Sequence, residues 1–152
     1  MDTKLVIAIA VPLGLGTLAG LMTKDEARGP WYDSLKKPSW SPPSWLFSPV
    51  WITLYVLMGI ASWRVWVRGR PQDALVLYGI QLALNLVWSF VFFKAHSLRW
   101  SLINIVSLLA VIAATIASFR RVDPTAAYLM APYFAWVAFA TALNANIFLQ
   151  NP

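Results

Sequence analysis

Long uncharged runs alternate with short charged or proline-containing breaks along this chain. The runs cover residues 5–23, 38–63, 74–93, 100–119 and 124–152. A helix needs about 20 mostly apolar residues to cross the hydrocarbon core of a bilayer, and each run is close to that length. Backbone within lipid must satisfy its own hydrogen bonds, so the runs should be helical. The pattern predicts an all-α integral membrane protein, a bundle of five transmembrane helices.

The predicted helices leave little of the 152-residue chain outside the membrane. We therefore expect one transmembrane domain over residues 1–152, with helices at about 5–23, 44–66, 74–94, 100–119 and 124–149. Asp123 and Pro124 suit the N-cap and the first position of the last helix, and Asp73 suits the N-cap of the third. Five spans also place the two termini on opposite sides of the membrane.

The most unusual stretch is residues 29–51, around the connection between the first two predicted helices. It carries five of the ten prolines and four of the nine tryptophans. Two helices need no such rigid, aromatic connector merely to be joined. We interpret the first connection, residues 24–43, as a lid over something flat and apolar.

Charged residues are few and lie near the helix ends. They make up 12% of the chain, against about 25% in soluble domains. The net charge is +6, but basic side chains at helix ends reach the lipid headgroups, so the charge does not indicate nucleic-acid binding. Six basic residues fall on each side, so the positive-inside rule does not orient the chain. One side has Lys4, Arg64, Arg68, Arg70, Arg120 and Arg121, and the other has Lys24, Arg28, Lys36, Lys37, Lys94 and Arg99.

The sequence lacks the groups that several kinds of chemistry require. No charged residue lies well within a predicted span, which disfavours proton-coupled pumps and ion transporters. The chain has no cysteine, so disulfides and thiolate metal sites are excluded. The single His96 falls in a short connection, where we interpret it as a solvated residue rather than a metal ligand. No nucleophile–base pair for acid–base or covalent catalysis is visible.

Aromatic and uncharged polar side chains within the spans fall at one depth. At 1.5 Å per residue, Trp51 lies roughly 10 Å and Trp88 roughly 9 Å below the first connection. Gln81, Asn85 and Trp88 share one helix face. The last helix brings Ala140, Leu143 and Asn144 to a comparable depth, with Trp136 one turn below them. Aromatic walls with a few amides suit a flat apolar ligand; alternatively, Gln81, Asn85 and Asn144 only form hydrogen bonds between helices.

Two pairs of small residues at helical spacing indicate close helix packing. Gly16 and Gly20 lie in the first helix, where they either pack within the bundle or contact a second copy of the chain. Gly79 and Ala83 form a similar pair in the third helix.

Three dense segments of this chain resemble the TspO/translocator protein family, also called tryptophan-rich sensory proteins or peripheral benzodiazepine receptors. They are WYDSLKKPSWSPPSWLFSPVW (31–51), QLALNLVWSFVFF (81–93) and PYFAWVAFATALN (132–144). The resemblance covers nearly the whole chain. It implies a five-helix membrane protein, usually a homodimer, that binds porphyrins such as protoporphyrin IX and haem. Members of the family also bind cholesterol and synthetic isoquinoline or benzodiazepine drugs.

The roles that the resemblance implies are tetrapyrrole transport and stress-linked sensing. Light-dependent porphyrin degradation, which would make the chain an enzyme, is an alternative, and a ligand-modulated interaction scaffold is another. No obligatory cofactor is implied, since porphyrin is the ligand. The expected partners are a porphyrin or another hydrophobic small molecule, the lipid bilayer and a second copy of the chain.

The resemblance also assigns roles to particular residues. The family's ligand pocket corresponds to Trp31, Tyr32, Trp51, Asn85, Trp88, Trp100, Trp136, Ala140 and Leu143, to which the depth argument adds Gln81 and Asn144. Ala140 resembles the small residue where added bulk alters ligand binding. Trp51 and Trp136 resemble the pair implicated in porphyrin photochemistry, and are the candidate redox residues. The Gly79 and Ala83 face resembles the dimer contact, which favours it over Gly16 and Gly20.

The end of the chain departs from the animal members of the family. Residues 143–152, LNANIFLQNP, contain no Tyr and no Lys or Arg, whereas the family's cholesterol motif requires a Tyr and a basic residue. This difference makes tight cholesterol binding unexpected. It favours a bacterial membrane over the mitochondrial outer membrane as the location.

Overall fold

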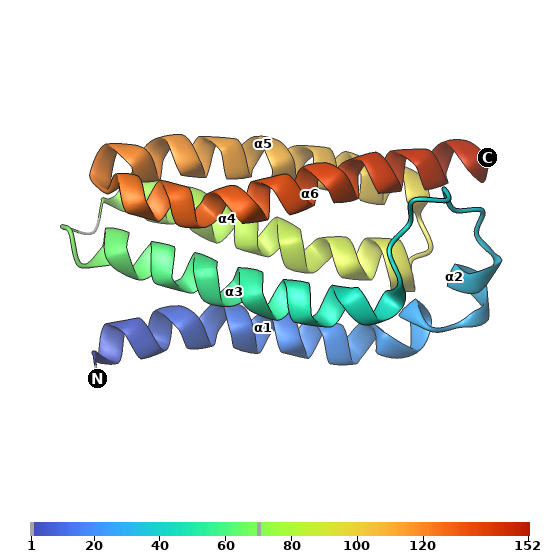
Figure 1. The fold of residues 1–152 in the computed structure, drawn as a ribbon, viewed down its shortest axis with the longest axis horizontal. Coiled ribbons are helices and arrows are strands. Elements are labelled where there is room, and N and C mark those ends of the chain that lie inside the picture. Colours follow the sequence, from blue (N-terminus) through green and yellow to red (C-terminus); the bar gives the residue numbers. More distant parts are fainter. Residues whose placement is uncertain (1, 70) are drawn as a thin grey trace.

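Five long helices run side by side through the computed structural model, which describes residues 2–69 and 71–152 (Figure 1). They are α1 (Thr3–Ala27), α3 (Ser44–Trp66), α4 (Gln72–Ser89), α5 (Leu98–Val122) and α6 (Pro124–Gln150). All five are long and apolar enough to cross a membrane, α4 together with the π-helical turn η1 (Phe90–Lys94). The prediction of an all-α bundle of five membrane-spanning helices is therefore confirmed. Arg70, one of the basic residues counted above, lies outside the described residues.

The helices that pack against one another determine which side chains can be in contact. The most extensive contacts join α5 to α6, α1 to α3, α4 to α5 and α3 to α6. The two chain ends lie at opposite ends of the bundle, as expected from five spans (Figure 1). A short helix, α2 (Pro30–Ser34), and the rest of the first connection lie at the end that holds the C-terminus. We call this the loop end, and the other the N-terminal end.

Several helix boundaries differ from the prediction. α1 continues to Ala27, because its polar last turn still favours helix where it leaves the apolar run. The prediction of Asp73 as an N-cap is wrong: Pro71 is the N-cap of α4, and Asp73 lies in the first turn. There its carboxylate still stabilises the positive end of the helix dipole.

Close backbone packing joins α1 to α3. A Cβ atom at Gly59 would lie 2.7 Å from the Ala8 carbonyl oxygen, so only glycine allows this approach. A Cβ atom at Gly16 would overlap the Tyr55 ring, whereas one at Gly20 would meet nothing. Of the two roles left open for Gly16, the structure shows packing within the bundle.

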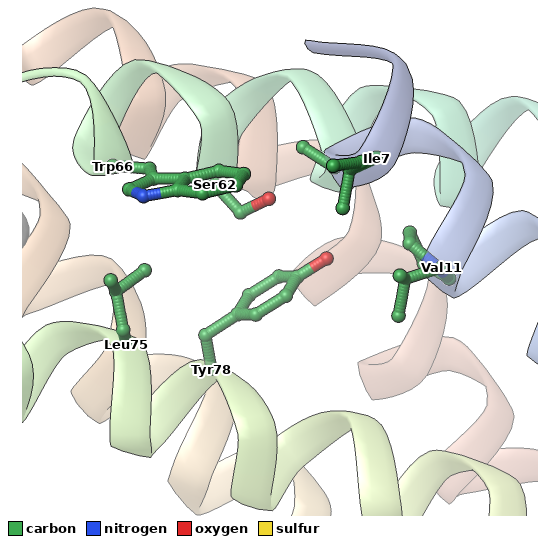
Figure 2. A pocket seen from close by; sticks show the side chains of 8 residues that line it. Ile7, Val11, Ser62, Trp66, Leu75 and Tyr78 are labelled. Carbon is green, nitrogen blue, oxygen red and sulfur yellow. The ribbon is translucent and has the colours of Figure 1, made fainter. Parts of the chain in front are cut away.

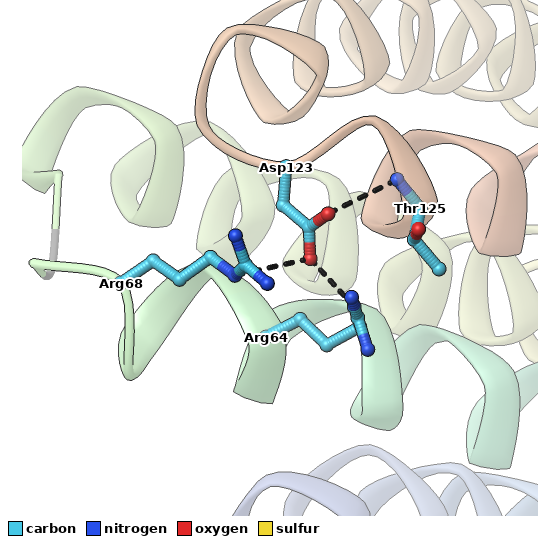
Figure 3. A network of polar contacts seen from close by, with 4 residues as sticks. All are labelled: Arg64, Arg68, Asp123 and Thr125. Carbon is cyan, nitrogen blue, oxygen red and sulfur yellow. Dashed lines mark hydrogen bonds and ion pairs between the residues drawn. The ribbon is translucent and has the colours of Figure 1, made fainter.

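Asp123 joins three helices at the N-terminal end (Figure 3). Its Oδ1 caps α6 by accepting a hydrogen bond from the Thr125 backbone N–H at 3.1 Å, as the sequence predicts. Its Oδ2 accepts from Arg64 Nε at 2.5 Å and lies 3.5 Å from Arg68 Nε, both near the end of α3. The Arg64 guanidinium holds the pKa of this carboxyl group below its ordinary value of 3.8. The α5–α6 turn is thereby attached to α3.

Replacing Asp123 should destabilise the bundle. Asp123→Ala removes the α6 cap and leaves Arg64 without its partner, so we expect a loss of about 1–2 kcal/mol. Because the pKa of Asp123 is lowered by folding, the carboxylate's contribution is present above about pH 4 and disappears as pH falls through the folded-state value. Thermal unfolding in detergent measures this. Asp73→Ala, which removes an exposed first-turn carboxylate of α4, is the matched comparison and should cost less, about 0.3–1 kcal/mol; an equal loss of melting temperature in both variants contradicts the assignment.

Candidate functional site

A buried hydrogen-bond chain links α3, α4 and α6 in the middle of the bundle. The Tyr55 hydroxyl donates to Asn85 Oδ1 at 2.8 Å, and Asn85 Nδ2 donates to the Tyr133 hydroxyl at 2.8 Å. The Tyr133 hydroxyl in turn donates to Gln81 Oε1 at 2.7 Å. All four side chains are buried, Gln81 and Tyr133 completely. The interhelical role considered for Gln81 and Asn85 is therefore what the structure shows.

Aromatic side chains of α3 and α6 lie directly toward the loop end from this chain. The Trp51 ring contacts Tyr55, Tyr133 and Trp136, with centroids 5.6, 6.4 and 6.5 Å away. Trp51 and Trp136 meet edge to face, at 87° between their planes. Ala140, one turn after Trp136, packs against the same core cluster. The predicted proximity of Trp51, Trp136 and Ala140 is thus seen in the structure.

A second aromatic group lies beneath the first connection, around η1. Phe92 is its buried centre, stacked on Trp88 at 4.9 Å between centroids and edge-on to Trp31 at 5.7 Å. Trp88 Nε1 donates a hydrogen bond to Asn144 Oδ1 at 2.9 Å, which joins α4 to α6. Leu143 packs in the same cluster. The predicted ligand residues Trp31, Trp88, Leu143 and Asn144 therefore lie together at the loop end.

Trp31 has a partner that the sequence did not suggest. His96 stacks on its indole ring, with centroids 4.2 Å apart and planes 6° from parallel. His96 has a positive φ of 54°, a backbone conformation that non-glycine residues rarely adopt. Tyr32 lies beside this pair, against Phe92 and Phe93. Burial of the Tyr32 ring raises the pKa of its hydroxyl group above its ordinary value.

The first connection is attached to the bundle in two ways. Its α2 part is held by the packing of Trp31 and Tyr32 around Phe92. Its later part is held to α6: Lys36 and Asn151 exchange two hydrogen bonds of 3.0 Å, one from the Lys36 backbone N–H to Asn151 Oδ1 and one from Asn151 Nδ2 to the Lys36 carbonyl oxygen, and Trp40 packs edge-on against Phe139, 5.6 Å between centroids. These later contacts with α6 are mainly exposed.

Two buried donors near the aromatic groups have no hydrogen-bond partner within residues 2–69 and 71–152. They are the indole Nε1 of Trp136 and the amide Nε2 of Gln81. An unsatisfied buried donor costs about 1–3 kcal/mol. A bound molecule with acceptor atoms would remove this cost, and Trp136 is the donor nearer the loop.

The structure separates Trp100 from the other predicted ligand residues. Trp100 is 61% exposed on the outer side of α5, and the Arg99 guanidinium lies 5.9 Å from its ring centre. It therefore faces the surroundings of the bundle rather than its interior. Trp45, in the first turn of α3, is likewise exposed, at 72%.

The sequence reasoning missed Tyr55, Tyr133 and Phe47 as residues of this region. Phe47 contacts Trp136 and packs into the cluster beneath the loop, so it connects the two aromatic groups. A signal was available for the tyrosines, because a hydroxyl within a membrane span needs a partner. Gln81 and Asn85, one turn apart on α4, were the available partners.

Gly79 and Ala83 lie on the outer face of α4. Both are exposed, and a Cβ atom added to Gly79 would meet nothing within 4 Å. Val76 and Ile80 are also exposed, at 53% and 45%. This apolar stripe is available to lipid or to another protein surface.

The sequence is similar to one family profile and to several proteins of animals and bacteria. The sequence profile of the TspO/MBR family matches residues 8–149. The "Translocator protein" of Sus scrofa is 44% identical over 126 residues, 80% of this chain and 75% of the pig protein. The "Tryptophan-rich protein TspO" of Chlorobaculum tepidum is 39% identical over 156 residues, 98% of this chain and 99% of its own. The "Tryptophan-rich sensory protein" of Cereibacter sphaeroides is 35% identical over 144 residues, 95% and 89% of the two chains.

Removing the Tyr133 hydroxyl should destabilise the bundle. Tyr133→Phe leaves Gln81 Oε1 and Asn85 Nδ2 without their shared partner, at a cost of about 1–3 kcal/mol. Thermal unfolding in detergent should show a lower melting temperature than for the wild type. Tyr128→Phe is the matched control, because Tyr128 is 77% exposed. Equal melting temperatures for the two variants would mean that the hydrogen-bond chain contributes nothing.

Proposed function

Because this chain belongs to the TspO/MBR family, we propose that it acts as a membrane sensor or transporter through the binding of porphyrins. Protoporphyrin IX, haem and similar flat hydrophobic molecules are the proposed ligands. The proposed site is the region between the two aromatic groups at the loop end, walled by Trp51, Trp88 and Trp136. The loop is its lid. The observation that carries the proposal is the edge-to-face contact of Trp51 with Trp136 near a segment whose attachments to α6 are exposed.

The chemistry of the region suits a tetrapyrrole. A porphyrin offers a flat aromatic face for stacking, and indole rings are large aromatic partners. It also carries propionate groups, which are hydrogen-bond acceptors. The unpartnered Trp136 Nε1 is a donor within the layer. Lys36 and Lys37 of the first connection supply cations at the same end of the bundle, whereas Lys94 there is already paired with Glu26 at 2.9 Å.

Binding requires the region to open, because its own side chains pack against one another. The Lys36–Asn151 hydrogen bonds and the Trp40–Phe139 contact are the attachments to α6 that must separate. Exposed hydrogen bonds of this kind each contribute only about 0.5–1.5 kcal/mol. The packing of Trp31 and Tyr32 on Phe92 can stay in place, so freeing this part of the loop is less costly than separating the helices.

Light-dependent porphyrin degradation is the second candidate function. The edge-to-face contact of Trp51 with Trp136 favours it, because two adjacent oxidisable indoles would line the bound macrocycle. The binding site is the same in both proposals. The two proposals differ in whether the bound porphyrin is chemically degraded when the complex is illuminated.

We also propose that the protein forms a homodimer through the outer face of α4. Gly79 and Ala83 are small and exposed, so two such helices can approach closely. Gly16 is unsuitable, because it already packs against Tyr55. A bacterial membrane is the proposed location, supported by the match to the full length of the Chlorobaculum tepidum protein.

Adding bulk at Ala140 should weaken porphyrin binding. Ala140→Leu places a branched side chain one turn from Trp136, within the proposed site, so we expect an affinity for protoporphyrin IX at least about tenfold lower, ~1.4 kcal/mol. Quenching of tryptophan fluorescence during titration in detergent measures it. Ala135→Leu on the exposed side of α6 is the matched control.

Two results would contradict this proposal. One is wild-type protein whose emission is not quenched at micromolar porphyrin; the other is equal affinity for the Ala140→Leu and Ala135→Leu variants. Illuminating the wild-type complex in the presence of oxygen distinguishes the two functions. A Soret band that decays no faster than that of porphyrin in empty micelles excludes degradation.

Bulk on the outer face of α4 should weaken the dimer. Ala83→Leu separates the two helices at their proposed closest point, and we expect about tenfold weaker association, ~1.4 kcal/mol. Light scattering coupled to size-exclusion chromatography measures the dimer fraction in detergent. Ala114→Leu on the exposed face of α5 is the matched control. A monomeric wild type, or an unchanged dimer fraction for Ala83→Leu, would reject this interface.

A further inference from the structure

A pocket of about 240 Å³ lies between α1, α3 and α4 near the N-terminal end of the bundle (Figure 2). It is distant from the proposed porphyrin site, which lies at the loop end. Its lining residues are Ile7, Ala8, Val11, Pro12, Ser62, Trp66, Leu75 and Tyr78. Ile7 and Val11 are 46% and 45% exposed, so the pocket reaches the outer surface of the bundle. Its opening faces lipid.

One polar group points into this apolar space without a partner. The Tyr78 side chain is 9% exposed, and its hydroxyl has no hydrogen-bond partner among the residues that the structure describes. Figure 2 shows this hydroxyl directed between Ile7 and Val11 of α1. Ser62 lies across the pocket, and its hydroxyl donates to the Gly59 carbonyl oxygen at 2.9 Å. Its lone pairs could still accept a hydrogen bond, but the Tyr78 hydroxyl has no partner among the described residues, so a bound molecule can supply an acceptor.

A cation lies at the outer end of the same pocket. The Lys4 ammonium group is 5.5 Å from the ring centre of Trp66, which lines the pocket. Lys4 precedes Ile7 by three residues, about 4.5 Å along the helix axis toward the membrane surface. Both oxygens of the neighbouring Asp2 carboxylate accept other hydrogen bonds, from the Lys4 backbone N–H and from Trp63 Nε1. The pocket thus has a basic outer end, a buried donor and apolar walls.

We propose that this pocket binds one anionic ester phospholipid from the adjacent leaflet. The phosphate lies at Lys4, an ester carbonyl oxygen accepts the Tyr78 hydrogen bond, and the upper part of one acyl chain lies against Val11 and Pro12. In a phospholipid the ester carbonyls lie a few bonds below the phosphate, which matches the order Lys4, Tyr78, Val11. The volume is smaller than the roughly 300–1,000 Å³ of sites for drug-sized molecules. It suits part of a lipid chain rather than a tetrapyrrole.

Native mass spectrometry of the purified protein, titrated with defined lipids, tests the proposal. The probes are phosphatidylglycerol with ester-linked chains, its ether-linked analogue and phosphatidylcholine. The ether analogue lacks the carbonyl acceptor, so the wild type should bind it about 3- to 10-fold more weakly than the ester lipid. Tyr78→Phe should remove this difference. Lys4→Gln should lower the preference for phosphatidylglycerol over phosphatidylcholine by about fivefold.

Two further variants serve as controls for the lipid-binding measurement. Tyr128→Phe removes an exposed hydroxyl at the same end of the bundle and should keep the ester–ether difference. Val11→Phe should weaken binding of both linkages by filling the pocket. A Tyr78→Phe protein with a wild-type melting temperature and an unchanged ester–ether difference would overturn the proposal. A Tyr78→Phe protein that changes only its dimer fraction would assign the pocket to a second copy of the chain.

Discussion

A polar group buried within a membrane bundle must find its partner inside the protein, and this constraint determines how the helices of this protein are arranged. The Tyr133 hydroxyl both accepts and donates, and so joins Asn85 and Gln81 of α4 to α6. Tyr55 extends the chain of hydrogen bonds to α3. Lipid cannot replace these bonds, so the register of three helices is fixed. The positions of Trp51 and Trp136, one turn before Tyr55 and one turn after Tyr133, follow from that register.

The two ends of the bundle differ in how their polar groups are satisfied. At the N-terminal end, Asp123 holds the α5–α6 turn to Arg64, a compact ion pair with a helix cap. At the loop end, the connection between α1 and α3 is joined to α6 through Lys36 and Asn151, both near the surface. The loop end also has an ion pair, Lys94 with Glu26 at 2.9 Å, and the packing of Trp31 and Tyr32 on Phe92. The part of the connection around Lys36 and Trp40 has only exposed attachments to α6, so it is the part that separates most readily.

The sequence predicted the helices well because length and hydropathy alone determine membrane spans. Helical periodicity also placed Gln81, Asn85 and Trp88 correctly on one face of α4. Trp100, expected among the ligand residues, faces outward instead. Its direction depends on the rotation of α5 about its own axis, which the hydropathy of a span does not encode. Pairings such as Trp31 with His96 depend on loop backbone conformation, which the sequence does not specify. Asp73 is not the N-cap of α4, because the helix already begins at Gln72 and Pro71 occupies the N-cap position.

The proposed porphyrin binding requires the loop to separate from α6 before the ligand enters. Because the chain has no cysteine, Lys36→Cys combined with Asn151→Cys allows the two segments to be joined by a short, reducible thiol cross-linker. The rate of protoporphyrin IX binding should then be followed by stopped-flow fluorescence before and after reduction. We expect the cross-linked protein to bind at least about tenfold more slowly, and reduction to restore the original rate. Equal rates in the cross-linked and reduced states would show that the ligand enters by another route.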